Sequence, residues 1–127
     1  MQLEILVEKV SDGVPVIRLK GEIDLQTSSG FKDTLREMID EGSRNIVIDL
    51  ALVPYLDSAA LGVLVDAVRR VREEDGAIYL VATTPFVRRA FEITRLARIF
   101  ELCDTLDIAL SDIRTKHAVP VGATAVA

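Results

Sequence analysis

Apolar and charged positions alternate at the start of the chain and then recur at helical spacing, which predicts a fold of mixed strands and helices. Leu3, Ile5 and Val7 are interleaved with glutamates, the pattern of a half-buried strand. A Ser-Asp-Gly turn signal over 11–13 precedes a second apolar run over 14–20. These two strands are therefore predicted to form a hairpin.

The rest of the chain is predicted to alternate between helices and strands. Two apolar runs, 46–50 and 77–81, indicate buried central strands, and Ile99-Phe100 indicates a short further one. Apolar residues three and four apart predict four helices. Their buried faces are expected to consist of Phe31, Leu35, Met38 and Ile39; of Leu61, Leu64, Val65, Val68 and Val71; of Phe86, Val87, Ala90 and Phe91; and of Leu106, Ala109, Leu110 and Ile113.

Each predicted helix begins after a residue suited to capping. Thr27 or Ser28 is expected to cap the first helix, Thr84 the third, with proline at the next position, and Thr105 the last. Strand–helix–strand units imply parallel neighbours with right-handed crossovers, and the hairpin adds an antiparallel pair. We therefore predict an α/β fold with a mixed four- to five-stranded sheet, about four helices and an opening β-hairpin.

The most informative stretch is 46–62, where a buried strand ends and Asp57-Ser58 opens the next helix. A hydroxyl and a carboxylate thus lie side by side at a helix N-terminus, where free backbone N–H groups and the helix dipole favour a phosphate. The alternative is that Ser58 only caps the helix. Ligand-facing loops of such sheets follow the carboxyl ends of strands, so Asp24 is expected at the same sheet edge.

Composition limits the class of protein. The 127 residues suit one domain, half of them are apolar, and the net charge of −5 argues against non-specific nucleic-acid binding. The single cysteine, Cys103, excludes an internal disulfide and fits a reducing compartment. No signal peptide or membrane span is recognised, so a cytoplasmic protein that binds neither nucleic acid nor membrane is expected.

The chain offers little for catalysis. A serine nucleophile needs a base, and the only histidine, His117, lies beyond the last predicted helix. Phosphate-binding and dinucleotide glycine motifs are missing. Asp24, Asp49 and Asp57 are too scattered to indicate a metal site. No enzymatic activity, metal or cofactor is therefore expected.

Three segments together resemble the STAS domain of the anti-sigma-factor antagonists. They are Gly21-Glu22-Ile23-Asp24 followed by Thr27, the strand Asn45 to Leu50, and the loop Tyr55-Leu56-Asp57-Ser58-Ala59-Ala60-Leu61-Gly62. The resemblance covers about residues 1–113, taken as the STAS domain, and 114–127 is expected to be a mobile tail. The family often has glycine at the position of Ala60, whose methyl group is expected to affect a partner's approach to Ser58.

The resemblance implies a partner switch. The unphosphorylated protein binds an anti-sigma factor that is also a serine kinase, and this frees the sigma factor. Ser58 would be the phosphoacceptor, and phosphorylation would switch binding off until a metal-dependent serine phosphatase reverses it. ATP and magnesium would belong to the kinase. The partner-binding residues implied are Asp24, Thr27, Asp57, Ser58, Ala59 and Gly62.

Alternatives stay open at this point. The domain could be a scaffold in a signalling assembly that is never phosphorylated, or a STAS module of a lipid or anion transport system. Asp24 could serve only to bond the backbone of its own turn.

Overall fold

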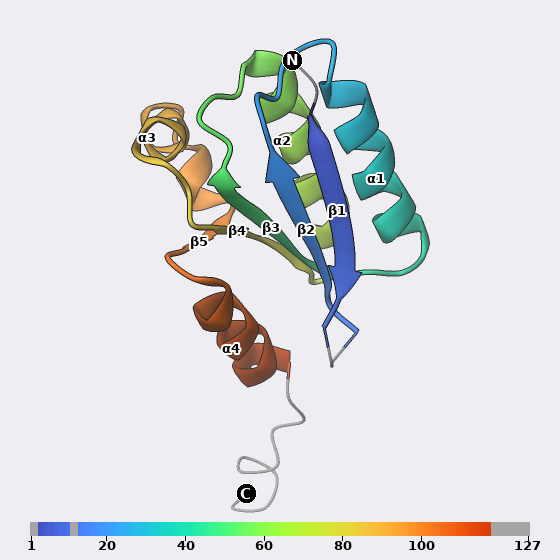
Figure 1. Ribbon diagram of the computed structural model, residues 1–127. Helices are drawn as coiled ribbons and strands as arrows, with labels where there is room; N and C mark the ends of the chain where they lie inside the picture. Colours follow the sequence, from blue (N-terminus) through green and yellow to red (C-terminus); the bar gives the residue numbers. More distant parts are fainter. Residues whose placement is uncertain (1–2, 11–12, 118–127) are drawn as a thin grey trace, which may run out of the picture.

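The computed structural model describes residues 3–10 and 13–117, which form a single mixed sheet flanked by helices (Figure 1). The strands are β1 (Glu4–Lys9), β2 (Pro15–Lys20), β3 (Asn45–Leu52), β4 (Ala77–Val81) and β5 (Glu101–Cys103). The helices are α1 (Ser28–Asp40), α2 (Ser58–Arg72), α3 (Pro85–Ile93) and α4 (Leu106–His117), with a short 3₁₀ turn over Leu96–Arg98.

The sheet has the order β1-β2-β3-β4-β5, so the strands lie side by side in the order of the chain. β1 and β2 pair antiparallel, from Glu4 opposite Lys20 to Lys9 opposite Pro15, and the other neighbours are parallel. The predicted hairpin, mixed sheet and helix count are therefore confirmed for the described residues. Parallel neighbours bring the carboxyl ends of β2, β3 and β4 to one edge of the sheet.

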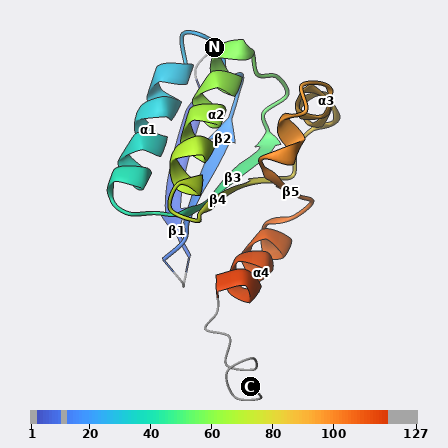
Figure 2. The same cartoon turned by 180° about the vertical axis from the view of Figure 1, so that it is seen from behind.

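One face of the sheet is covered by α1, α2 and α3 (Figure 2). The strands contribute inward residues at every second position, as the two-residue period of a strand requires. The helices contribute most of the stripes predicted from their spacing, but Phe86 of α3 is exposed. The fully buried members of this core include Ile17, Ile46, Ile48, Leu50, Ile78, Leu80, Phe31, Leu35, Leu64, Val68, Val87 and Phe91.

Among the described helices, α4 alone covers the other face, over β3, β4 and β5. Here the buried strand residues are Val16, Val47, Tyr79, Val81 and Cys103, and α4 packs Ala109 and Ile113 against them. This explains why β4 is apolar along its length and why β3 is apolar at most of its central positions, with Asp49 as the exception: both faces of these strands are covered.

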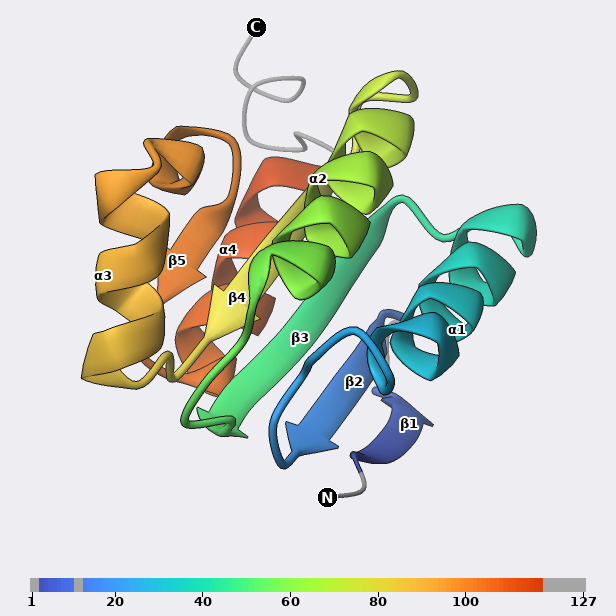
Figure 3. The same ribbon diagram turned by 90° about the horizontal axis from the view of Figure 1, so that it is seen from above.

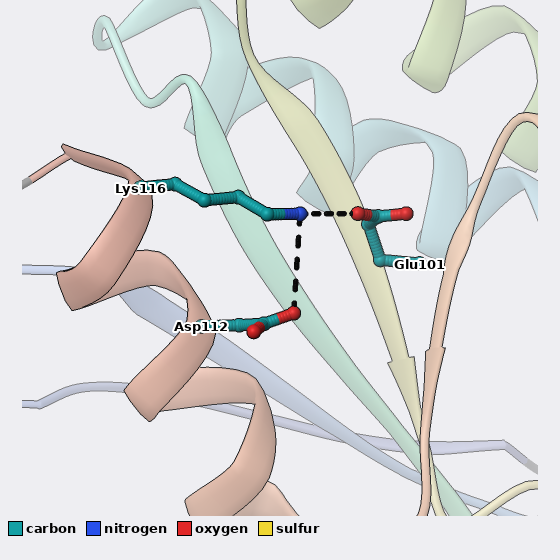
Figure 4. Close-up of polar contacts among 3 residues, drawn as sticks. All are labelled: Glu101, Asp112 and Lys116. Carbon is teal, nitrogen blue, oxygen red and sulfur yellow. Dashed lines mark hydrogen bonds and ion pairs between the residues drawn. The ribbon is translucent and has the colours of Figure 1, made fainter.

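The end of α4 is held by Lys116 (Figure 4). Its Nζ lies 2.6 Å from Glu101 Oε1 on β5 and 3.9 Å from Asp112 Oδ2, one helical turn earlier. It also lies 5.9 Å from the centre of the Tyr79 ring. The hydrogen bond to Glu101 raises the pKa of Lys116 above its ordinary value.

The boundary between domain and tail differs from the expected one. The tail was predicted to begin at residue 114, but α4 continues to His117. Residues 114–117 carry no apolar side chain, and the last turn of α4 is stabilised by the ion pairs of Lys116 instead. The rest of the predicted tail, 118–127, lies outside the described residues.

The predicted short strand at Ile99-Phe100 is wrong by two residues, because β5 covers Glu101–Cys103. Phe100 is instead a core residue whose ring meets that of Phe91, with centroids 5.3 Å apart at an interplanar angle of 72°. The apolar signal at this point therefore reflects burial before the strand begins.

The sequence predicts no membrane span. Over residues 3–10 and 13–117, none of the helices combines the length and the apolar character that crossing a bilayer demands.

Candidate functional site

The loops that follow β2 and β3 leave the same edge of the sheet (Figure 3), and backbone hydrogen bonds join them. Gly21 N–H donates to the carbonyl of Leu52 (3.0 Å), and Ile23 N–H donates to that of Tyr55 (3.2 Å). Asp57 N–H donates back to the carbonyl of Ile23 (3.1 Å). Ile23 and Leu56 thus form a parallel bridge beyond the ends of the strands. We call residues 21–27 and 53–62 the carboxyl edge.

Asp57 is the N-cap of α2. Its backbone is extended (φ −105°, ψ −173°), and its Oδ1 accepts a hydrogen bond from the N–H of Ala60 at 3.1 Å. This is the usual geometry of a capping aspartate. The cap role that the sequence left open for Ser58 therefore belongs to Asp57.

Ser58 is the first residue of α2, and its side chain is exposed. Within the described part of the chain, its hydroxyl has no hydrogen-bond partner. The hydroxyl is thus free to react, next to the unpaired N–H groups and positive dipole end of a fifteen-residue helix. Such a position stabilises an added phosphate.

Asp24 and Thr27 bond mainly to their own loop. Asp24 Oδ1 accepts from the N–H groups of Gln26 (2.9 Å) and Thr27 (3.0 Å). Thr27 Oγ1 accepts from Asp24 N–H (2.9 Å) and donates to the carbonyl of Glu22 (3.1 Å). The hydrogen bond from the Thr27 backbone is the main cause of a lowered pKa at Asp24. Asp24 therefore has the turn role that the sequence offered as an alternative, and its carboxylate is favoured in the charged form.

The capping predictions for α1 and α3 are wrong in their details. Thr27 stands at the N-cap of α1 but makes no side-chain cap bond, because its hydroxyl is used within the preceding turn. Thr84 likewise makes no cap bond for α3, and its hydroxyl donates to the carbonyl of Val53 at 3.2 Å. Thr105 does cap α4, accepting from Ile108 N–H at 3.2 Å.

The small residues after Ser58 have separate positions. Ala59 is half-buried, and Gly62 is exposed with open space where a side chain would project. Ala60 is fully buried against the core, so its methyl group points away from the surface around Ser58. The expectation that Ala60 affects a partner's approach to Ser58 is therefore wrong. Ala59 and Gly62 leave the first turn of α2 unobstructed.

The sequence did not predict three exposed apolar residues on the loops around α2 and at the start of α3. Leu25 is 76% exposed in the loop of Asp24, and Tyr55 is 40% exposed just before Asp57. Phe86 was expected on the buried face of α3 but is 58% exposed. Helical spacing alone cannot distinguish it from Val87, because one residue further along a helix turns the side chain by about a quarter of a circle.

Among the described residues, no three side chains of His, Cys, Asp and Glu gather as a metal site would require. His117 ends α4, which covers the sheet face opposite α2. The geometry at the carboxyl edge thus provides a free hydroxyl beside carboxylates and exposed apolar groups, which suits modification and binding.

Residues 6–109 match the family model of the STAS domain. The chain belongs to the STAS domain family. It is similar to the solved structure of an anti-sigma factor antagonist from Mycobacterium paratuberculosis. The two are 34% identical, with a TM-score of 0.80 over 88% of this chain and 94% of that one. The anti-sigma-B factor antagonist of Staphylococcus aureus is 27% identical over 92 residues, which are 72% of this chain and 85% of the relative.

This STAS domain also shares its fold with the phosphorylated form of the Bacillus cell fate determinant SpoIIAA. The TM-score is 0.72 at 22% identity, over 87% of this chain and all of that one. The family and the fold that the sequence resemblance implied are both confirmed. The individual roles of Asp24, Thr27, Asp57, Ser58, Ala59 and Gly62 stay predictions.

Proposed function

We propose that this STAS domain is an anti-sigma-factor antagonist that works as a phosphorylation-dependent partner switch. Its unphosphorylated form binds an anti-sigma factor that is a serine kinase, and the sigma factor is released. The kinase then phosphorylates Ser58, and the antagonist dissociates. A metal-dependent serine phosphatase restores the binding form.

The observation that carries this proposal is the free hydroxyl of Ser58 at the first position of α2. Asp57 already caps the helix, so modifying the Ser58 hydroxyl breaks no hydrogen bond among the described residues. The N-terminal N–H groups and the dipole of α2 can stabilise a phosphate by roughly 0.3–1 kcal/mol at an exposed position. The fold is therefore expected to tolerate the modification.

Phosphorylation has a different effect on a bound partner. A phosphoserine brings about −1.5 to −2 charges at neutral pH. At Ser58 this charge lies beside Asp57, and an interface formed around the neutral hydroxyl must desolvate it next to a like charge. Such mismatches cost several kcal/mol. A loss of about 3 kcal/mol weakens affinity on the order of a hundredfold.

The test is titration calorimetry with the purified anti-sigma serine kinase of the same organism. Unphosphorylated protein and Ser58→Ala are expected to bind, while the phosphorylated form and Ser58→Asp bind about a hundredfold more weakly. Mass spectrometry after incubation with kinase and ATP is expected to place one phosphate on Ser58. Equal affinities of the two forms, or a phosphate on another residue, would favour the scaffold function instead.

The predicted contact of Asp24 with the partner can be tested in the same assay. Asp24→Ala is expected to weaken binding by the kinase while circular dichroism stays unchanged. Asp24→Asn is the matched variant, because it keeps an oxygen that can accept the turn hydrogen bonds. If both variants bind as tightly as the wild type, Asp24 acts only within its turn.

A further inference from the structure

An exposed aromatic pair lies where the loop before Ser58 meets the start of α3. The rings of Tyr55 and Phe86 have centroids 5.7 Å apart at an interplanar angle of 40°. Tyr55 precedes the helix cap by two residues, and Phe86 is in the first turn of α3. Both rings remain substantially exposed, at 40% and 58%, whereas Val87 and Phe91 of α3 are fully buried. Because the two rings are in contact, they form one continuous exposed apolar patch, and such patches can mark interaction sites.

The backbone around the pair is braced. The Tyr55 carbonyl accepts a hydrogen bond from Ile23 N–H at 3.2 Å, which ties it to the loop after β2. The Thr84 hydroxyl donates to the carbonyl of Val53 at 3.2 Å, which ties the start of α3 to the loop that carries Tyr55. Pro85 begins α3 and restricts the backbone there. The two rings are therefore presented from fixed positions, which lowers the entropy lost on binding.

The surroundings of the pair resemble the anatomy of a protein interface. Aromatic groups form the centre, and the carboxylates of Asp24 and Asp57 lie on the loops beside it. Interfaces commonly have such an apolar, aromatic centre with a charged rim. A matching partner surface carries an apolar side chain that covers the two rings, with basic groups around it.

We propose that Tyr55 and Phe86 form the apolar anchor for the anti-sigma partner, an inference that rests on the function proposed above. The two rings are uncharged and belong to a different part of the edge from the Ser58 hydroxyl. They contribute to the affinity for the partner equally in the unphosphorylated and the phosphorylated form. Ser58 and Asp57 cause the difference in affinity between the two forms.

The experiment compares binding of the purified anti-sigma serine kinase to the wild type, Tyr55→Ala and Phe86→Ala by titration calorimetry. Each anchor variant is expected to weaken binding at least tenfold, as central aromatic residues of interfaces do. Ile93→Ala is the matched control, because Ile93 is a 67% exposed apolar residue on the same helix. It is expected to bind within twofold of the wild type.

A second measurement tests the division of roles. Each variant is combined with Ser58→Asp, and the weakening caused by Ser58→Asp is expected to be the same with and without the aromatic ring. Wild-type affinity in both Tyr55→Ala and Phe86→Ala would overturn the anchor while leaving the switch in place. A changed effect of Ser58→Asp would overturn the separation of the two roles. If the wild type itself does not bind the kinase, the proposed function fails and the anchor fails with it.

Discussion

The hydroxyls of Ser58 and Tyr79 stand in contrasting regions. Ser58 is exposed at the carboxyl edge, whereas the Tyr79 hydroxyl is buried beneath α4. Neither makes a hydrogen bond within the described residues. Burial raises the pKa of Tyr79 and of its neighbour Cys103, so both are kept neutral. At the carboxyl edge, by contrast, hydrogen bonds lower the pKa of Asp24 and favour its charge.

This contrast shows where the fold can accept a new charge. Under α4 an added charge must be taken out of water without compensation, which is costly. At the edge, water and the N-terminus of α2 are both available to a phosphate. The same sheet therefore has one region suited to packing and one suited to modification.

The largest effect that tests this comparison is expected from Ile113→Ala. Ile113 on α4 is buried against the sheet, and its truncation leaves a cavity that lowers the free energy of unfolding by about 2–4 kcal/mol. Ile108→Ala, at a 49% exposed position of the same helix, is the control and is expected to cost far less. Denaturant unfolding measures both. Loss of partner binding in folded Ile113→Ala protein would show that the two regions are not independent.

A smaller effect is expected from removing the cap of α2. Asp57→Ala loses the hydrogen bond to Ala60 N–H and lowers the free energy of unfolding by about 1 kcal/mol. Asp66→Ala removes an exposed carboxylate from the same helix without touching the cap. Chemical denaturation of the two variants distinguishes the effect of losing the cap hydrogen bond from the effect of losing a negative charge. Equal stability of both would mean that Asp57 does not cap the helix in solution.

The ion pair that holds α4 is expected to contribute less. Lys116→Met removes the contact with Glu101 but keeps the aliphatic stem, and costs about 0.2–1 kcal/mol because the pair is partly exposed. The difference from wild type should shrink as salt is added. Lys32→Met on α1 provides a control at an exposed lysine. A loss of stability that does not depend on salt would indicate that the aliphatic stem of Lys116, rather than its ion pair, stabilises the protein.

The smallest effect concerns the turn of Asp24 and depends on pH. Because its pKa in the folded protein lies below the ordinary value of 3.8, the unfolded chain binds the proton more readily. Its contribution to stability is therefore complete above that value and is lost as the pH falls through the folded pKa. NMR titration of the carboxyl group measures the pKa, and Asp24→Asn should remove this part of the acid sensitivity. A pKa at or above 3.8 contradicts the turn bonding.

Much of the fold could be predicted because apolar spacing is a local signal. The runs at 46–50 and 77–81 are buried at all positions except Asp49 and Ala77, and the helix stripes follow from a period of 3.6 residues. The failures occurred where tertiary contacts overrode that signal. Phe100 looks like part of a strand but packs on Phe91, and Phe86 looks like core but meets Tyr55 at the surface.

The sequence by itself determined the STAS fold, the position of Asp57-Ser58 at a helix start, and the shared sheet edge with Asp24. These follow from patterns and turn chemistry within short segments. Only the tertiary structure decided which residue caps α2, that Ala60 faces the core, and that Tyr55 and Phe86 pair at the surface. Those facts depend on which atoms meet across separate loops, and hydrogen bonds or ring contacts between distant segments leave no mark in local spacing.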